Sequence, residues 1–284
     1  MAKRAKRATA SASPLPTPPS APTEPRQRLL ADLASLRVAL TADLLDDVLA
    51  QAAQQSWSHL EFATRLLGAA ADRRRERSLE RRLAEARLSN APTLETFDWQ
   101  FNAPTIKRTL IEELASCAFV RRHENVIVVG QSGLGKSHLF KALGRCACVH
   151  GFRVRYTTSA DLIQDLKATL ADDSLSARLR YWTNFDLLII DEFGFERLER
   201  QACPQAPQLL YKVIEARYVQ HATVLVTNVD FEAWGEYLGD APLAMAFLDR
   251  LVDGALVLKL RGRSYRAARA RTLTADQADD AQSK

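Results

Sequence analysis

Residues 130–137 read Gly130-Gln131-Ser132-Gly133-Leu134-Gly135-Lys136-Ser137 and directly follow the apolar run 126–129. The octapeptide fits the phosphate-binding pattern G-x-x-x-x-G-K-[ST], and an apolar run before it is the context that the pattern requires. Backbone amides of such a loop, and of the helix that follows it, surround phosphate oxygens. The stretch predicts a nucleotide site in which Lys136 faces the β- and γ-phosphates and Ser137 ligates Mg²⁺.

Short β-rich runs alternate with helical stretches along the rest of this region. The runs are residues 126–129, 154–157, 187–190 and 223–227, and a helical segment at 106–120 precedes them. Alternation of this kind is typical of an α/β fold with a central parallel sheet and crossover helices. No internal repeat is visible at solenoid periods.

Two carboxylates end the run 187–190, at Asp191 and Glu192. The carboxyl ends of parallel strands are where α/β sheets bind ligands. After a phosphate-binding loop, this pair is expected to form a Walker B element. Asp191 would hold Mg²⁺ through its water shell, and Glu192 would orient and polarise the attacking water.

A further polar residue, Asn228, ends the run 223–227. Its amide can donate one hydrogen bond to phosphate and accept one from water, which would suit a sensor of the nucleotide. An asparagine turn at a strand end is the alternative, and spacing alone favours that alternative.

The positive charge is concentrated in the first third of the chain. Residues 1–90 hold 15 of the 39 Lys and Arg but only 10 of the 34 Asp and Glu. That asymmetry suggests an arm that binds a polyanion, joined to a neutral core, but it does not distinguish DNA from RNA or a membrane surface.

Residues 28–87 follow a helical period, and the last of them are rich in arginine. The candidate DNA contacts are Arg73, Arg74, Arg75, Arg77, Arg81 and Arg82. Acidic residues at i,i+4 spacing accompany them, so the two readings are a solvated helix with many ion pairs and a helix that contacts phosphates. Residues 1–25 are basic and then rich in Ser, Pro and Thr, a composition typical of disorder.

Composition sets limits on location and cysteine chemistry. No apolar run approaches the length of a membrane helix, and the basic start is followed by polar residues, so we expect no membrane partner and a cytoplasmic location. Four cysteines do not make a disulfide framework in a chain of this length. Cys146, Cys148 and His150 are expected to pack on a helix and not to bind a metal, because Cys148 would point away from the other two.

Beyond single motifs, the chain resembles the IstB and DnaC group of AAA+ ATPases over about residues 27–266. The resembling stretches are residues 93–98, 125–144, 187–194, 209–218, 227–234, 247–251 and 262–266. The Gly262-Arg263-Ser264-Tyr265-Arg266 element, and Asn228 followed by Trp234, are more similar to IstB than to helicase loaders. Residues 200–207 depart from the family pattern, and Thr227 stands where the family usually has Ser.

The resemblance implies an AAA+ P-loop core with a central parallel sheet, preceded by a small all-helical domain. It implies that ATP and Mg²⁺ bind between neighbouring subunits, with Asn228 as the sensor and Arg250 as an arginine finger. From the residues alone, Arg250 reads as a surface ion pair. Arg266 would sense the γ-phosphate, and residues 130–137, His138 and Arg266 would together contact the nucleotide.

The expected organisation is a basic tail (1–26), a helical DNA-binding arm (27–90), an AAA+ ATPase domain (91–270) and a flexible C-terminal tail (271–284). The expected function is an ATPase that assembles as a homo-oligomer on double-stranded DNA and assists a cognate transposase. One alternative is a DnaC-like loader of a replicative helicase. Another is a scaffold that binds ATP without hydrolysing it, which the presence of Glu192 disfavours.

Overall fold

The computed structural model describes residues 24–102, 105–171, 174–194 and 204–270. The predicted basic tail and C-terminal tail, and Cys203 of the departing stretch, fall largely or wholly outside these ranges. The chain divides into two compact units, Met1–Glu76 and Arg77–Lys284, which are described separately below.

The first unit is helical. It contains α1 (Pro25–Ser35), α2 (Ala42–Gln55) and most of the long α3 (His59–Glu85), whose remaining residues belong to the second unit. Leu45, Val48 and Leu66 form its small buried core, as the apolar period of the sequence requires. The Thr41 side chain caps α2 by accepting a hydrogen bond from the backbone N–H of Leu44.

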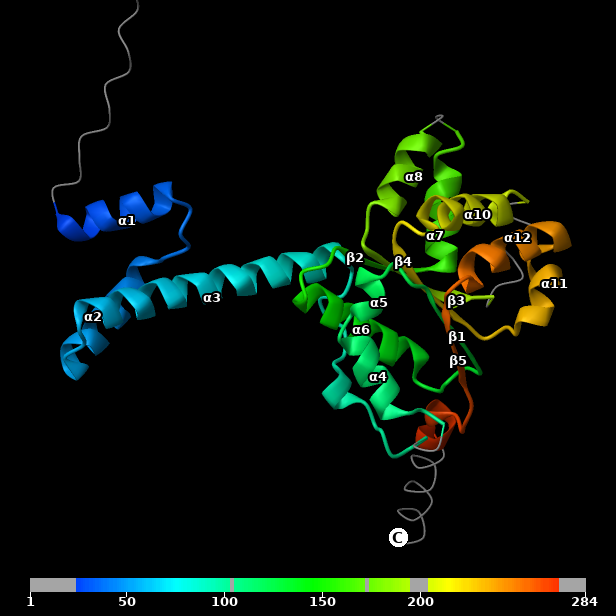
Figure 1. Ribbon diagram of the computed structural model, residues 1–284, viewed down its shortest axis with the longest axis horizontal. Coiled ribbons are helices and arrows are strands. Elements are labelled where there is room, and N and C mark those ends of the chain that lie inside the picture. The colour runs from blue at the N-terminus through cyan, green and yellow to red at the C-terminus, as the bar shows by residue number, and fades with distance from the viewer. Residues whose placement is uncertain (1–23, 103–104, 172–173, 195–203, 271–284) are drawn as a thin grey trace, which may run out of the picture. The chain divides into compact units, whose positions relative to one another are not determined.

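A five-stranded parallel sheet organises the second unit (Figure 1). Its order is β2-β3-β4-β1-β5. The strands are β1 (Val126–Gly130), β2 (Val154–Thr158), β3 (Leu187–Phe193), β4 (Ala222–Thr227) and β5 (Leu256–Leu260). The helices are α4 (Arg108–Ala115), α5 (Ala118–Arg121), α6 (Lys136–Val149), α7 (Ser159–Ala168), α8 (Leu175–Thr183), α10 (Ala206–Arg217), α11 (Trp234–Leu238) and α12 (Ala241–Val252), with short 3₁₀ turns at Leu94–Thr96 and Phe231–Ala233.

Alternate side chains along the strands pack into two separate hydrophobic cores, one on each face of the sheet. Val126 and Val128 pack with α4, α5 and α6, whereas Ile127 and Val129 pack with α7, α8 and α10–α12 (Figure 1). The central strands are buried on both faces, which explains their continuous apolar sequence. The prediction of an α/β fold with a central parallel sheet, preceded by a small all-helical region, is confirmed.

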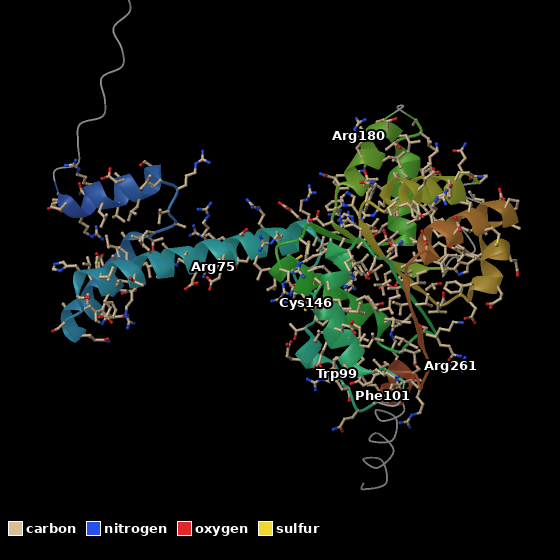
Figure 2. The ribbon with its side chains drawn as sticks, in the orientation of Figure 1. Arg75, Trp99, Phe101, Cys146, Arg180 and Arg261 are labelled. Carbon is tan, nitrogen blue, oxygen red and sulfur yellow. The ribbon has the colours of Figure 1, made fainter. Side chains whose placement is uncertain are left out.

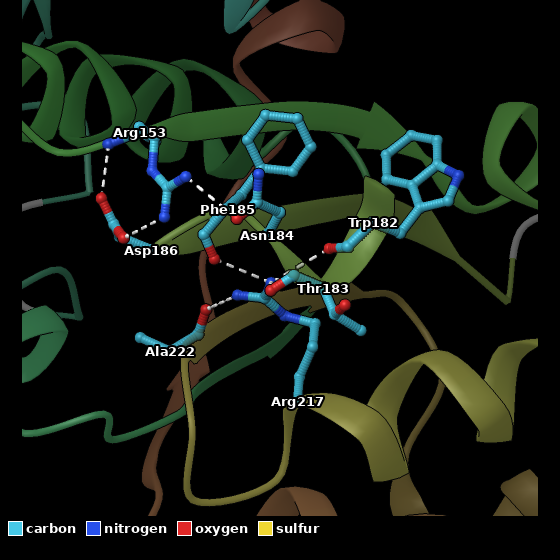
Figure 3. A network of polar contacts seen from close by, with 8 residues as sticks. All are labelled: Arg153, Trp182, Thr183, Asn184, Phe185, Asp186, Arg217 and Ala222. Carbon is cyan, nitrogen blue, oxygen red and sulfur yellow. Dashed lines mark hydrogen bonds and ion pairs between the residues drawn. The ribbon is translucent and has the colours of Figure 1, made fainter. Parts of the chain in front are cut away.

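A buried arginine, Arg217, connects the end of α8, the loop that leads into β3 and the first residue of β4. Arg217 is 1% exposed and donates hydrogen bonds to the backbone oxygens of Trp182, Phe185 and Ala222 (Figure 3). Burial lowers its pKa to about 9. Since its acceptors are neutral carbonyls, Arg217 caps the last turn of α8 and ties it to the start of β4.

No helix within the described residues is both long enough and apolar enough to cross a membrane. Cys148 is buried, Cys146 is half-buried and His150 is exposed at the end of α6. In the part of the chain that the structure describes, no group of three or more His, Cys, Asp or Glu could hold a metal ion.

Candidate active site

The phosphate-binding loop connects β1 to α6 and needs glycine at two positions. Gly133 and Gly135 have φ values of 86° and 85°, in the region that side chains disfavour. A Cβ at Gly135 would come 2.7 Å from Phe97 Cε2, and one at Gly133 would collide with the Ser264 hydroxyl. The loop is therefore in close contact both with the segment before the core and with the residues after β5.

Lys136 begins α6, and its side chain turns back over the loop. Its Nζ donates hydrogen bonds to the backbone oxygens of Gly130, at 2.5 Å, and Gln131, at 2.8 Å. Burial lowers the pKa of Lys136, the charge of Asp191 raises it, and the charge of Arg266 lowers it further. An anion near Nζ would favour the charged lysine, so the arrangement suits a phosphate.

Asp191 is 2% exposed and is held at both carboxylate oxygens. Oδ2 accepts a hydrogen bond from the Tyr156 hydroxyl at 2.7 Å, and Oδ1 accepts one from the backbone N–H of Glu192 at 2.8 Å. Burial, together with the adjacent Asp191 carboxylate, raises the pKa of Tyr156. Tyr156 thus remains a neutral donor that fixes the Asp191 side chain.

Glu192 is exposed and has a left-handed backbone conformation, with φ 59°. The pairing of β3 with β4 shifts register between Ile190 and Phe193, which identifies a bulge at this point. The Thr227 hydroxyl stabilises the bulge by donating to Phe193 O at 2.8 Å. A strained, non-glycine residue at a strand end is a common feature of functional sites.

One pocket of about 350 Å³ collects most of the expected site residues. Residues 132–138, Asp191, Glu192, Asn228 and Arg266 all line it. Gly130 and Gln131 contribute indirectly, through the carbonyls that bind Lys136. The Ser137 hydroxyl and the Asp191 carboxylate are oxygen donors of the kind that Mg²⁺ prefers, so they fit the expected metal.

The wall of the pocket includes residues that sequence reasoning did not assign to the site: Thr96, Phe97, Asp98, Phe101, Asn102 and Tyr265. Asn102 exchanges two hydrogen bonds of 3.1 Å with the backbone of Arg263, and the Phe101 and Tyr265 rings meet edge to face. Phe101 lies with Trp99 and Arg261 at the same end of this unit (Figure 2). The resembling stretches 93–98 and 262–266 were the available signal, but their contact was not predictable.

Arg250 is not among the residues that line the pocket. Its guanidinium pairs with Asp249 at 2.7 Å and lies over the Tyr218 ring, 5.0 Å from its centroid. Its side chain is 35% exposed. In this unit, therefore, Arg250 is a surface residue of α12.

The six arginines expected to contact DNA differ in their surroundings. Arg74 and Arg77 are exposed and make no hydrogen bond or ion pair within the described residues. Arg75 pairs with Asp72, and the exposed Arg81 lies 3.8 Å from Glu85. Arg73 donates to the Thr41 hydroxyl, and Arg82 donates to Cys148 O, each inside its own unit.

Comparisons with known proteins identify the family of this chain. The family model described as IstB-like ATP binding protein matches residues 31–273. A protein named for ATP binding in insertion sequence IS21 of Pseudomonas aeruginosa is 37% identical over 222 residues, which cover 78% of this chain and 82% of the relative. A protein similarly named for insertion sequence IS5376 of Geobacillus stearothermophilus is 33% identical, over 78% of this chain and 86% of the relative.

Among solved structures, the DnaC helicase loader is 19% identical with a TM-score of 0.48, over 62% of this chain and 99% of that chain. A nucleotide-analogue complex of DnaA from Aquifex aeolicus is also 19% identical, with a TM-score of 0.47, over 60% of this chain and 50% of that chain. The family match includes residues 130–137, Asp191, Glu192 and Asn228, and it extends over most of the chain. The chain belongs to the family of IstB-like ATP-binding proteins.

Proposed function

We propose that this chain is an ATPase that assists a transposase in moving an insertion sequence. The observation that carries the proposal is the single pocket that joins Lys136, Ser137, Asp191 and Glu192. These are the groups that phosphate binding, metal binding and water activation require. The names of the relatives, which connect ATP binding with insertion sequences, support the biological role.

Each side chain has a distinct role in this proposal. Lys136 would exchange its bonds to the two loop carbonyls for contacts with the β- and γ-phosphates. Ser137 and Asp191 would hold Mg²⁺, which when bound neutralises charge on the phosphate oxygens. Glu192 would accept a proton from the attacking water, and Asn228 would orient that water or the γ-phosphate.

Assembly would complete the site. Arg250 does not line the pocket of its own subunit; its half-exposed guanidinium would exchange its pairing with Asp249 for a neighbour's nucleotide. An arginine supplied in this way contributes roughly 10³ to 10⁵ in rate. Arg266, which lines the pocket of its own subunit, would contact the γ-phosphate directly.

Mixing of variants tests this shared site. Arg250→Ala and Glu192→Gln should each bind ATP but turn it over slowly. A mixture should regain activity, because an Arg250→Ala subunit keeps its own Glu192 and a Glu192→Gln subunit offers its Arg250. A mixture that co-assembles but stays inactive would reject a role for Arg250 in a neighbouring site.

DNA binding would use the exposed cations of α3. Arg74, Arg77 and Arg81 are spaced i, i+3 and i+7, so they share a helix face, and all three are exposed. Arg73 is a weaker candidate, because it already binds the Thr41 hydroxyl. The proposed ligand is duplex DNA, bound by a homo-oligomer that presents it to the transposase in the cytoplasm.

One experiment separates this proposal from its two rivals. ATP turnover is measured with and without duplex DNA, while particle size is followed and the transposase or the replicative helicase is added. The proposal predicts DNA-dependent assembly, turnover, and binding of the transposase. Binding of the helicase instead would indicate a loader, and assembly without turnover would indicate a non-catalytic scaffold.

A further inference from the structure

A second pocket, of about 320 Å³, lies within the unit Arg77–Lys284 and shares no residue with the ATP pocket. Its walls include Arg82, Arg153, Arg155, Tyr181, Asn184 and Phe185. Arg153 and Arg155 lie in or next to the first part of β2, whereas the last residue of that strand, Thr158, pairs with Asp191. The second pocket is therefore near the amino end of the edge strand, away from the phosphate-binding loop.

Two of these guanidinium groups have only neutral partners. Arg82 donates to Cys148 O at 2.9 Å and to the Ser78 hydroxyl at 3.0 Å. Arg155 donates to Glu85 O at 2.7 Å, and its Nε is buried without any hydrogen-bond partner. Buried polar groups are nearly always satisfied, so an orphaned guanidinium nitrogen is uncommon. Burial is also the main cause that lowers the pKa of Arg155.

The carboxylates nearby are already paired with other groups. Asp186 accepts bonds from the backbone N–H of Arg153 at 2.7 Å and from its guanidinium at 3.3 Å (Figure 3). Glu85, which also lines the pocket, has a 63% exposed side chain that lies 3.8 Å from Arg81. Asp165 is bound by Arg178 and by the Trp182 indole. The charges of Arg82 and Arg155 therefore lack a carboxylate partner of their own.

Two aromatic rings next to Arg155 limit the hydration of its guanidinium. Its guanidinium carbon lies 5.8 Å from the Tyr181 ring centroid and 5.7 Å from that of Trp182. Charge-assisted hydrogen bonds are stronger in such surroundings than in water, and guanidinium groups match the oxygens of a phosphate.

We propose that this second pocket binds a phosphate group, which Arg82 and Arg155 would hold. The phosphate could belong to a DNA backbone or could be free in solution, and the test distinguishes the two sources. If the phosphate belongs to DNA, the inference rests on the proposed function, because the pocket would then be a site at which this unit binds the duplex. If the phosphate is free in solution, the inference does not depend on the proposed function.

The test uses full-length protein saturated with Mg²⁺ and ADP, so that the first pocket is filled. Inorganic phosphate is titrated calorimetrically, and a fluorescein-labelled duplex oligonucleotide is titrated over a range of salt concentrations. Arg82→Gln and Arg155→Gln are compared with Arg121→Gln. Arg121 is a matched control, since it donates to the neutral Ser116 O at 3.2 Å and lies over the Phe152 ring, but it does not line the pocket.

We expect the wild-type protein and Arg121→Gln to bind phosphate, and Arg82→Gln and Arg155→Gln to lose that binding. If the source is DNA, the two pocket variants should also weaken duplex binding several-fold and reduce the slope of log K against log salt by about one. Loss of phosphate binding with unchanged DNA binding would identify free phosphate as the ligand.

The inference would be overturned if Arg82→Gln and Arg155→Gln both bind phosphate and DNA as the wild-type protein does. Should Arg155→Gln fail to fold, which thermal unfolding would reveal, Arg82→Gln decides by the same two titrations. If the protein binds no DNA at all, the DNA part of the proposed function fails, while the phosphate titration still tests the pocket.

Discussion

Asp191 shows how neighbouring residues orient one side chain for its proposed role in holding Mg²⁺. Its two oxygens accept hydrogen bonds from the Tyr156 hydroxyl and the Glu192 N–H, so the carboxylate is held in one orientation. Precise orientation of ligands by surrounding groups commonly strengthens metal binding. Tyr156 lies on β2, the strand next to Asp191, and is a positioning residue in this account.

Replacing Tyr156 with Phe should therefore raise the Mg²⁺ concentration needed for half-maximal nucleotide binding, by about tenfold. Nucleotide affinity in EDTA should not change, because Tyr156 does not line the pocket. Tyr211→Phe is the control, since its hydroxyl also bonds a carboxylate, that of Glu215 at 3.1 Å, but on α10. Equal Mg²⁺ dependence of the two variants would show that Tyr156 does not position Asp191.

The sequence motifs predicted which side chains come together in the pocket, but not the hydrogen bonds that orient them. Lys136, Ser137, Asp191 and Glu192 follow from patterns that are local in sequence. The bond from Tyr156 to Asp191 joins residues 35 apart, and it depends on the pairing of β2 with β3. No local pattern contains that pairing.

Two segments close one end of the ATP pocket: residues 96–102, which precede α4, and the residues that follow β5. Asn102 joins them through its two bonds to Arg263, and the Thr105 hydroxyl donates to Arg261 O. Gly262 permits the approach, because a Cβ there would come 2.5 Å from the Asn102 Oδ1 atom. The pocket wall thus depends on a contact between segments about 160 residues apart.

Loss of this contact should affect stability and nucleotide binding together. Asn102→Ala leaves the Arg263 backbone groups without partners, which should cost about 2 kcal/mol in the free energy of unfolding. It should also weaken ATP binding, since Asn102 lines the pocket. The control is Asn90→Ala, at an exposed residue without hydrogen bonds in the described structure. Urea unfolding measures the stability of the two variants, and nucleotide titration measures their affinity for ATP. Equal stability and equal affinity of Asn102→Ala and Asn90→Ala would contradict the role of Asn102.

The sequence predicted four of the five strands to within a few residues, because each is an apolar run between turns. It did not assign residues to β5, where a charged Lys259 interrupts the apolar pattern at the edge of the sheet. The helix predicted over residues 106–120 is in fact two, α4 and α5, because Cys117 has a left-handed conformation with φ 57°. Backbone conformations of this kind are not readable from a helical period.

The molecule as a whole is organised as two units, and the end of α3 belongs to the second. Leu83, Ala86 and Leu88 are buried in the core around α6, and Ala86 O accepts a hydrogen bond from the β2 residue Tyr156. A domain boundary at residue 90, as proposed from composition, would place these side chains in the arm. Composition cannot locate such a boundary, because the charged and buried residues of α3 are interleaved.

Truncation distinguishes the two boundaries. A chain that starts at Arg77 should fold and bind ATP, since it keeps the complete core of the second unit. A chain that starts at Ala91 loses two buried leucines and should be destabilised by on the order of 5 kcal/mol. Thermal unfolding checks both, and equal stability of the two chains would contradict the importance of residues 77–90 for the core.

The central claim is that this pocket hydrolyses ATP with Glu192 as the group that activates water. The most direct test measures ATP affinity and turnover for the wild-type protein, Lys136→Ala and Glu192→Gln. Lys136→Ala should lose tight binding, whereas Glu192→Gln should bind as the wild type does and hydrolyse ATP at least about 10²-fold more slowly. Wild-type turnover by Glu192→Gln, or unchanged ATP affinity of Lys136→Ala, would contradict the account.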